Sequence, residues 1–425
     1  MPSIVRSSTH SLKYTNIGKL ADLEIIRNRY TKLVALMVDD IWDNGLDFNG
    51  NRYHNARFDR SKHQYDLPSS APKEFYNKFG DFGLSARIRN QASTQALGMI
   101  KAAVAKNAKR VWQLRNNHRN GWQARKLQQA IARNDKKPST KNLKMQLSSK
   151  NVDIVDTGGE FEQFVRISAL GDFEPICIPI RHHRHSNALR SKYKQSSAIL
   201  VGADSVQLVY KADVPTKCSG GKVGVDQGVV DTARLSDGQV TGKCIHGHDL
   251  SSIQDKLARK KKGSKAFRQA QQHRTNYINY AINRLNLSDY REVRLEKVRS
   301  LRKGRASSRK LSHWAYAEIE SKFHALSETE GFQLTLVPNA FMSQRCSECG
   351  WVKKSNRKGK GFVCTSCGIM LDADENSSQN QLLNLYEIPY RLIVSKLNRT
   401  GFYWDEFGIW QADGSSLESL LPQKV

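Results

Sequence analysis

The sequence lacks a long hydrophobic run. No apolar stretch approaches the length that crosses a bilayer, and residues 1–14 have no apolar signal-peptide core. We therefore expect neither a membrane protein nor a secreted one, and place the chain in the cytoplasm. Its 425 residues are enough for two or three domains.

Acidic residues are scarce. Asp and Glu total 40 against 68 Lys and Arg, which gives a formal net charge of +28. Such an excess must be solvated or neutralised, and a polyanion is the natural partner. An anionic membrane surface is the competing explanation, but the absence of a long apolar segment counts against it.

The scarcity of acids is greatest in residues 84–150, which hold sixteen Lys and Arg and a single acid, Asp135. Neighbouring like charges repel on a helix, so a solvated helical face would normally mix signs. Basic residues interleaved with tryptophans suit a phosphate backbone and unstacked bases. We predict nucleic-acid contacts here, made by Arg110, Trp112, Arg115 and Trp122.

Cysteines are also few, and they do not form a disulfide framework. Of the seven, four follow the spacing C-x2-C-x14-C-x2-C, and a glycine comes after each pair. This spacing predicts one tetrahedral Zn²⁺ with no open position, hence a structural metal. Redox-active pairs or an iron–sulfur cluster are the alternatives. The predicted zinc ligands are Cys346, Cys349, Cys364 and Cys367.

Three of the scarce acids stand at distinctive places. Asp226 follows the apolar segment VGV between Gly224 and Gly228, small residues that would let a phosphate or metal approach the backbone. Glu296 lies on a predicted strand, and Asp374 comes just before a predicted helix, at an N-cap-like place. Each acid alone is ordinarily a cap, a turn or a surface charge.

Together the three acids suggest a different role. Mg²⁺ prefers oxygen ligands, and two such ions can promote phosphodiester hydrolysis when carboxylates from several elements converge on them. A strand end, a later strand and a helix start form the arrangement of a ribonuclease-H-like nuclease. Within LDADENSSQN, Asp372 is predicted to be a turn residue and Glu375 a first-turn helix charge.

The remaining pattern alternates helices and strands. Helical spacing marks residues 20–46 and the segment after Ile88, β-rich segments follow residue 142, and an α/β region begins near residue 220. Within that region the segment LSHWAYAEIESKFHALSETEG is predicted to be an amphipathic helix that ends at Gly331. A long basic helix is expected from about 250 to 286, with a solvated face as the alternative to phosphate binding. Its predicted phosphate contacts are Lys260, Lys261, Lys262, Arg268 and Arg274.

The ordered motifs GVDQG, VRLEKV, CSECG, CTSCG and DADENSSQN resemble the TnpB family of transposon-encoded RNA-guided nucleases. Compact type V CRISPR effectors are similar and share the split RuvC-like domain. The resemblance is clear over residues 220–388 and much weaker upstream. The chain departs from the usual motifs at Gln227 and Met342, and Ser377 and Ser378 replace two alanines.

The resemblance implies a multidomain α+β fold. A helical recognition lobe and a β-rich wedge barrel would precede a RuvC-like, ribonuclease-H-like α/β nuclease domain with an inserted zinc ribbon. The implied domains are residues 1–16 (N-terminal wedge strand), 17–140 (helical recognition domain), 141–219 (wedge barrel), 220–342 (first nuclease part), 343–370 (zinc ribbon), 371–390 (last nuclease part) and 391–425 (C-terminal tail).

The implied function is RNA-guided cleavage of double-stranded DNA next to a target-adjacent motif. Asp226, Glu296 and Asp374 would be the catalytic acids that hold two Mg²⁺, and the cysteines would hold one Zn²⁺. The partners would be a guide RNA and target DNA, with no membrane, in a monomer or dimer that joins the nucleoid during action. Alternatives are a CRISPR-associated effector, a guided DNA-binding repressor with little cleavage, and a guide-independent nuclease or transposase.

Overall fold

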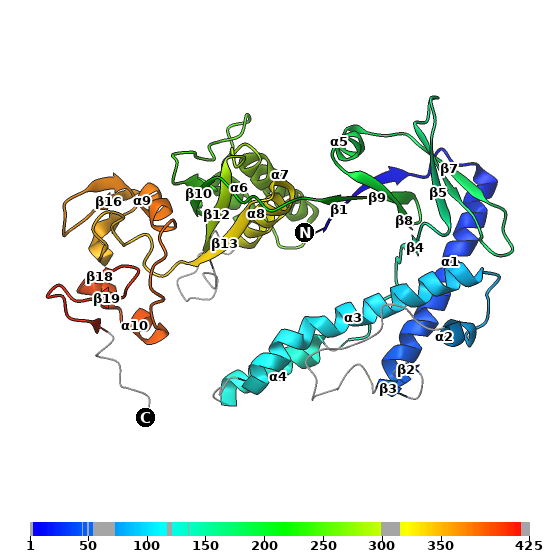
Figure 1. Cartoon of the computed structure of the whole chain (residues 1–425), viewed down its shortest axis with the longest axis horizontal. Coiled ribbons are helices and arrows are strands. Elements are labelled where there is room, and N and C mark those ends of the chain that lie inside the picture. Colours follow the sequence, from blue (N-terminus) through cyan, green and yellow to red (C-terminus); the bar gives the residue numbers. More distant parts are fainter. Residues whose placement is uncertain are drawn as a thin grey trace. The chain divides into compact units, whose positions relative to one another are not determined.

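A computed structural model describes residues 3–44, 46–48, 51–53, 73–116, 121–134, 136–298 and 315–417. The chain divides into two compact units, each with its own core (Figure 1). One comprises Val5–Ala212, and the other Asp213–Val425 with Met1–Ile4. No helix in the described ranges has the length and apolar character needed to cross a membrane.

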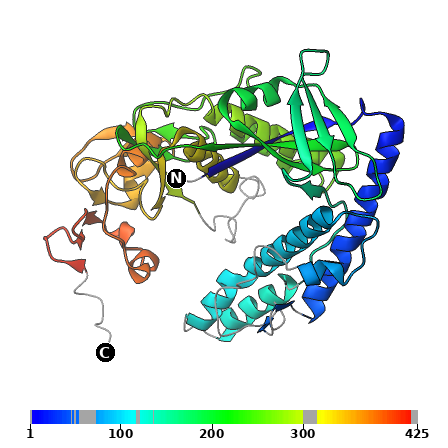
Figure 2. The ribbon, with the colours of Figure 1, turned by 45° about the vertical axis from the view of Figure 1, so that its right-hand side comes forward.

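Long helices dominate the first half of the Val5–Ala212 unit, as the helical spacing predicted. Buried residues of α1, including Ile26, Tyr30 and Met37, pack in one core with Ile88 and Ala92 of α3. Helix α4 lies along α3 (Figure 2), and Asn107 Nδ2 donates a 3.0 Å hydrogen bond to Ile131 O between them. The elements here are α1 (Ile17–Asn44), β2 (Leu46–Phe48), β3 (Asn51–Tyr53), α2 (Lys73–Asn77), α3 (Ala86–Asn116) and α4 (Gly121–Asn134).

The β-rich part of this unit consists of two sheets, in the orders β1-β9-β8-β4 and β5-β6-β7. The N-terminal strand joins the first sheet, as the sequence suggested. The segment RHHRH begins helix α5, and His183 caps that helix by accepting from Ser186 N. The elements are β1 (Ser3–Ser11), β4 (Met145–Leu147), β5 (Val152–Asp156), β6 (Gln163–Ile167), β7 (Ile176–Ile180), α5 (Arg184–Lys192), β8 (Lys194–Val201) and β9 (Ser205–Asp213).

The second unit is built on a four-stranded sheet in the order β11-β10-β12-β13. Strands β10, β12 and β13 are mutually parallel, and β11 is antiparallel to β10. Three helices, α6 (Leu250–Ala258), α7 (Lys265–Ile282) and α8 (Tyr316–Glu330), lie together beside the sheet (Figure 1). Their buried residues share one core with Val223, Val225, Val293 and Leu295 of the sheet. The strands are β10 (Gly221–Asp226), β11 (Arg234–Leu235), β12 (Tyr290–Lys297) and β13 (Gln333–Pro338).

The expected single basic helix from 250 to 286 is in fact two helices, α6 (Leu250–Ala258) and α7 (Lys265–Ile282). Gly263 adopts a left-handed φ of 84° in the turn between them, and Ser264 caps α7 by accepting from Phe267 N. A glycine in that conformation followed by a serine cap starts a new helix. Further along, α8 (Tyr316–Glu330) ends at Gly331 with a φ of 78°, as its sequence predicted.

A cysteine-bearing module follows β13 and leads into α9 (Ala373–Asn380). The C-terminal tail, for which the sequence offered no motif, pairs with this module in the sheet β14-β18-β19. Phe402 and Trp404 of the tail are buried in a core with Val352. The remaining elements are β14 (Trp351–Val352), η3 (Lys354–Asn356), β15 (Arg357–Lys358), β16 (Gly361–Val363), β17 (Met370–Asp372), α10 (Tyr390–Val394), η4 (Leu397–Arg399), β18 (Phe402–Trp404) and β19 (Ile409–Trp410).

Candidate active site and zinc ribbon

The structure brings the four spaced cysteines together. Their sulfurs all lie within 4.8 Å of one another, with 3.7 Å between Cys346 and Cys367 and 3.5 Å between Cys349 and Cys364. A tetrahedral zinc with bonds of 2.3 Å requires sulfurs about 3.8 Å apart. The donor set and its spacing therefore fit one zinc ion.

Each cysteine pair is closed by a tight turn, as predicted. Gly350 and Gly368 have φ values of 79° and 78°, which suit residues without a Cβ. Their amides donate to Cys346 O and Cys364 O at 3.1 and 3.0 Å. Burial raises the pKa of the Cys346 thiol, so binding of a metal there must release a proton.

Asp226 and Glu296 leave neighbouring parallel strands at the same level. Val225 of β10 pairs with Leu295 of β12, and each acid is the next residue of its strand. Because side chains alternate along a strand, the acids point to the face opposite Val225 and Leu295. The Gln227 amide crosses between these strands, donating to Glu296 O at 2.7 Å.

Helix α9 reaches this same face through a close contact at Gly224. A Cβ at Gly224 would lie 2.0 Å from Ser378 O, so only glycine permits the helix backbone to pack there. At Gly228 a Cβ would meet Asp231 O at 2.3 Å. Both glycines therefore make room for the protein's own backbone, and not for a phosphate or metal as the sequence suggested.

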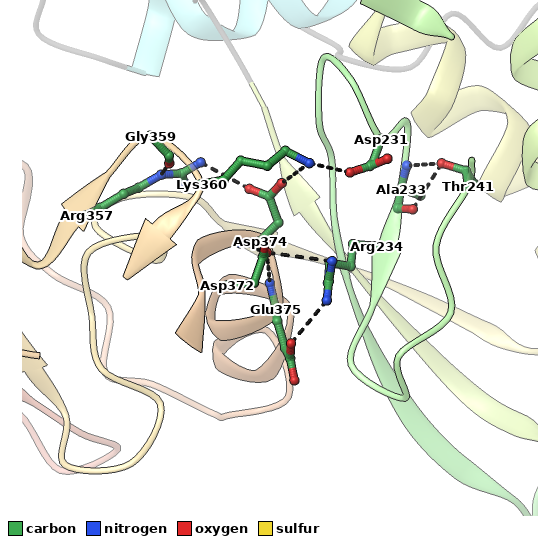
Figure 3. Close-up of polar contacts among 10 residues, drawn as sticks. All are labelled: Asp231, Ala233, Arg234, Thr241, Arg357, Gly359, Lys360, Asp372, Asp374 and Glu375. Atoms are coloured by element: carbon green, nitrogen blue, oxygen red, sulfur yellow. Dashed lines mark hydrogen bonds and ion pairs between the residues drawn. The ribbon is translucent and has the colours of Figure 1, made fainter. Parts of the chain in front are cut away.

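The start of α9 corrects the prediction for the acidic cluster. Asp372, not Asp374, is the N-cap, and its carboxylate accepts from the amides of Asp374 and Glu375 at 2.9 and 3.2 Å. Asp374 is the second residue of the helix and lies in its first turn, because the ladder of β17 continues to Asp372. Arg234 then joins β11 to Asp372 and Glu375, at 3.7 and 3.1 Å (Figure 3).

Burial and neighbouring charges shift the pKa values of Asp226 and Glu296 upward. Burial raises the pKa of Asp226 well above its ordinary range, and the nearby Glu296 raises it further. Ser377 opposes this shift, because its hydroxyl donates to Asp226 Oδ1 at 2.6 Å. Burial also raises the pKa of Glu296 to about 7, and the charge of Asp374 adds to that shift.

Asp374 is held by two cations from the cysteine module. Arg357 Nη2 lies 3.1 Å from Asp374 Oδ1, and Lys360 Nζ lies 3.8 Å from its Oδ2 (Figure 3). Lys360 Nζ is also 2.5 Å from Asp231 Oδ2, in the loop after β10. Sequence reasoning missed these two cations, and it noted Ser377 only as a replacement of an alanine within DADENSSQN, not as a partner of Asp226.

The three acids are less tightly grouped than the four cysteines. In the described part of the chain, the cysteines are the one group of three or more potential ligands whose donor atoms all lie within 4.8 Å of one another. The charges of the acids nevertheless influence one another, because Glu296 and Asp374 both raise the pKa of Asp226, and Asp374 raises that of Glu296. Carboxylate oxygens from several elements are the ligands that hard divalent cations prefer.

The basic side chains predicted to contact nucleic acid differ in how exposed they are. Lys261, Lys262 and Arg268 are exposed and Lys260 is partly exposed, in the α6–α7 turn and at the start of α7. Arg274, however, is only 9% exposed and ion-paired with Glu318 of α8. The Arg274 guanidinium neutralises the Glu318 carboxylate where α7 and α8 pack, so Arg274 is not available to a phosphate.

The aromatic residues predicted to contact bases are accessible. Trp112 of α3 is 49% exposed and Trp122 of α4 is 63% exposed, and Lys126 Nζ lies 3.6 Å from the Trp122 ring centroid. Arg110 is partly buried and donates to Asn107 at 3.4 Å. The side chain of Arg115 lies outside the described residues.

Comparisons with known proteins identify proteins similar to parts of this chain. The family model "Cas12f1-like, TNB domain" matches residues 316–381. A CRISPR-associated endodeoxyribonuclease, Cas12f1 of Sulfoacidibacillus thermotolerans, is 27% identical over 175 residues, 39% of each chain. A TnpB-like protein of Aquifex aeolicus is 35% identical over 97 residues, 21% of this chain and 31% of that one.

The chain thus spans well under half the length of each of these two relatives. A solved structure of CasPhi-2 (Cas12j) bound to crRNA aligns with a TM-score of 0.51 at 9% identity, covering 89% of this chain and 97% of that one. At that identity the likeness concerns the fold alone, a multidomain α+β architecture. The resemblance indicated by the motifs is confirmed: the chain is related to TnpB-like proteins and to the compact Cas12 proteins.

Proposed function

We propose that the chain is an RNA-guided DNA endonuclease whose cleavage site is formed by Asp226, Glu296 and Asp374. The observation that carries the proposal is the meeting of three acids from β10, β12 and α9 on one face of a sheet. The strand order β11-β10-β12-β13 supports a ribonuclease-H-like, RuvC-type domain. The relative named an endodeoxyribonuclease supports DNA as the substrate.

The chain's own residues would prepare this site for a phosphodiester. The raised pKa values of Asp226 and Glu296 come first from burial and then from neighbouring carboxylates, and bound cations would offset both costs. Two Mg²⁺ held by the three carboxylates would activate the attacking water and stabilise the leaving oxygen. Ser377 keeps Asp226 oriented, and Arg357 brings a positive charge to the side of the pocket next to Asp374.

The rest of the chain would deliver nucleic acid to the site. We propose that Trp112 and Trp122 stack on RNA bases, and that Lys260, Lys261, Lys262 and Arg268 contact backbone phosphate. A guide RNA would select double-stranded DNA by base pairing. The domain boundaries from the sequence, including the recognition lobe, wedge barrel and zinc ribbon, belong to this proposal.

The decisive test is Asp226→Ala, assayed with copurified guide RNA and matching duplex DNA. Cleavage should fall below detection, while guide and target binding persist, because the substitution removes one of the three carboxylates and leaves the basic surfaces intact. Cleavage that survives would refute the assignment. Asp153→Ala, at an exposed position of β5, is the matched control and should cleave normally.

Sequencing the copurified RNA tests the guided part separately. A single abundant RNA with a constant scaffold and a variable end supports guidance, whereas bulk cellular RNA contradicts it. A guided binder without cleavage is disfavoured, because all three acids are present on one face of the sheet. Loss of cleavage in Asp226→Ala with active wild-type protein would exclude that alternative.

A further inference from the structure

Lys360 occupies a position between two largely shielded carboxylates. Its Nζ lies 2.5 Å from Asp231 Oδ2 and 3.8 Å from Asp374 Oδ2 (Figure 3). The side chains of Asp231 and Asp374 are 19% and 10% exposed, whereas that of Lys360 is 52% exposed. A flexible stem thus carries one positive charge from solvent to the edge of the acid site.

Arg357, the other cation on Asp374, is held more firmly. Its Nη2 lies 3.1 Å from Asp374 Oδ1 while its Nε donates to Gly359 O at 3.1 Å. A planar guanidinium with two such contacts is fixed in orientation, whereas an ammonium on a four-carbon stem rotates readily. Asp374 therefore has one fixed cation and one that can leave.

The backbone of Lys360 is fixed beside the acid site. Its carbonyl accepts a 2.7 Å hydrogen bond from the amide of Ala373, the residue before Asp374. Gly361 is paired with Asp372 in the β16–β17 ladder. Departure of the ammonium from Asp374 therefore requires movement of the side chain alone.

We propose that Lys360 is a built-in, displaceable counter-cation of the acid site. Before metal binds, its ammonium neutralises Asp231 and Asp374 together. A divalent cation that takes Asp374 must displace the ammonium from Oδ2, and the ammonium then remains on Asp231. Lys360 thus lowers the affinity for divalent cations and stabilises the metal-free pocket, which rests on the proposed role of Asp374 as a metal ligand.

The test measures Mn²⁺ binding to the full-length, zinc-loaded protein without nucleic acid. The electron paramagnetic resonance signal of free Mn²⁺ reports how much of the ion remains unbound. Lys360→Gln should bind Mn²⁺ roughly two- to fivefold more tightly, because a partly exposed ion pair no longer has to be broken. Lys360→Arg should bind more weakly, since a guanidinium can hold both carboxylates. Lys358→Gln, an exposed lysine of the same hairpin, is the charge-matched control and should match wild type.

The outcomes separate this inference from the proposed function. Mn²⁺ binding that Asp226→Asn does not weaken would mean that the proposed metal site is wrong. Asp226-dependent binding with unchanged or weaker affinity in Lys360→Gln would overturn the counter-cation and leave the proposed function standing. As a second readout, Lys360→Gln without added divalent metal should unfold at a lower temperature than wild type, and added Mn²⁺ should remove the difference.

Discussion

The second unit contains two sets of potential metal ligands that are assembled in opposite ways. The four cysteines lie within residues 346–367 and gather through two local turns. The three acids extend from residue 226 to 374 and meet only because α9 packs on β10 beside β12. The cysteines are spaced to fit one ion, whereas the acids are accompanied by the positive charges of Arg357 and Lys360. Local spacing is sufficient to gather the cysteines, but the grouping of the acids depends on the tertiary fold.

Removing the cysteine site should have the largest effect on stability. Cys364→Ser should lose the zinc and unfold the ribbon, because zinc binding supplies about 10–16 kcal/mol of apparent folding free energy in small zinc modules. Metal content and thermal unfolding measure the effect. Cys177→Ser, an exposed cysteine of β7, is the control. A stable, zinc-free Cys364→Ser protein would show that the ribbon does not depend on metal.

For the acid site we expect instead that the stability of the metal-free protein falls as pH rises. Glu296 has an ordinary pKa near 4.5 and a folded pKa of about 7, so between these values the folded state binds the extra proton. Metal-free stability should therefore decline over that window by up to about 3 kcal/mol. Glu296→Gln should flatten the decline in denaturant titrations at several pH values. An unchanged slope would show that Glu296 is not the group responsible.

Gly224→Ala should separate the two sites. The new Cβ would meet Ser378 O at 2.0 Å and push α9 away from β10, which should cost about 1–3 kcal/mol. We expect DNA cleavage to be lost while the zinc content stays at one ion per chain, because the cysteine turns do not involve β10. Gly238→Ala, where no atom lies within 4 Å, tests a glycine without this packing role, although its positive φ adds local strain. Equal losses of zinc and cleavage in Gly224→Ala would contradict the separation.

Ser377→Ala should have the smallest effect. Loss of the 2.6 Å hydrogen bond raises the pKa of Asp226 further, because the hydroxyl favours the charged form. The rising limb of the pH–cleavage profile should move upward by about one pH unit. Ser377→Thr, which keeps a hydroxyl, should restore the wild-type profile. An unchanged pH–cleavage profile would mean that alanine, the usual residue at this position of the motif, supports cleavage equally well.

Much of the structure of the second unit could be predicted from local sequence patterns. The strands around Asp226 and Glu296, the helix that ends at Gly331 and the cysteine turns all appear where the sequence predicted them. Each of these depends on neighbours a few residues away, through side-chain alternation or a glycine at a positive φ. Two predictions failed because of contacts over long separations: Arg274 pairs with Glu318, and Gly224 accommodates α9. Two others failed locally, at the break between α6 and α7 and at the N-cap of α9.

The sequence by itself determined which groups this chain carries: a basic surface, four thiols at zinc spacing and three acids in ordered motifs. Only the tertiary structure decided what surrounds those acids. Ser377 reaches Asp226 and Lys360 reaches Asp231 across more than a hundred residues, because α9 and the cysteine module pack against β10 and its loop. Charge and burial at such a site depend on distances in space, which spacing along the chain does not encode.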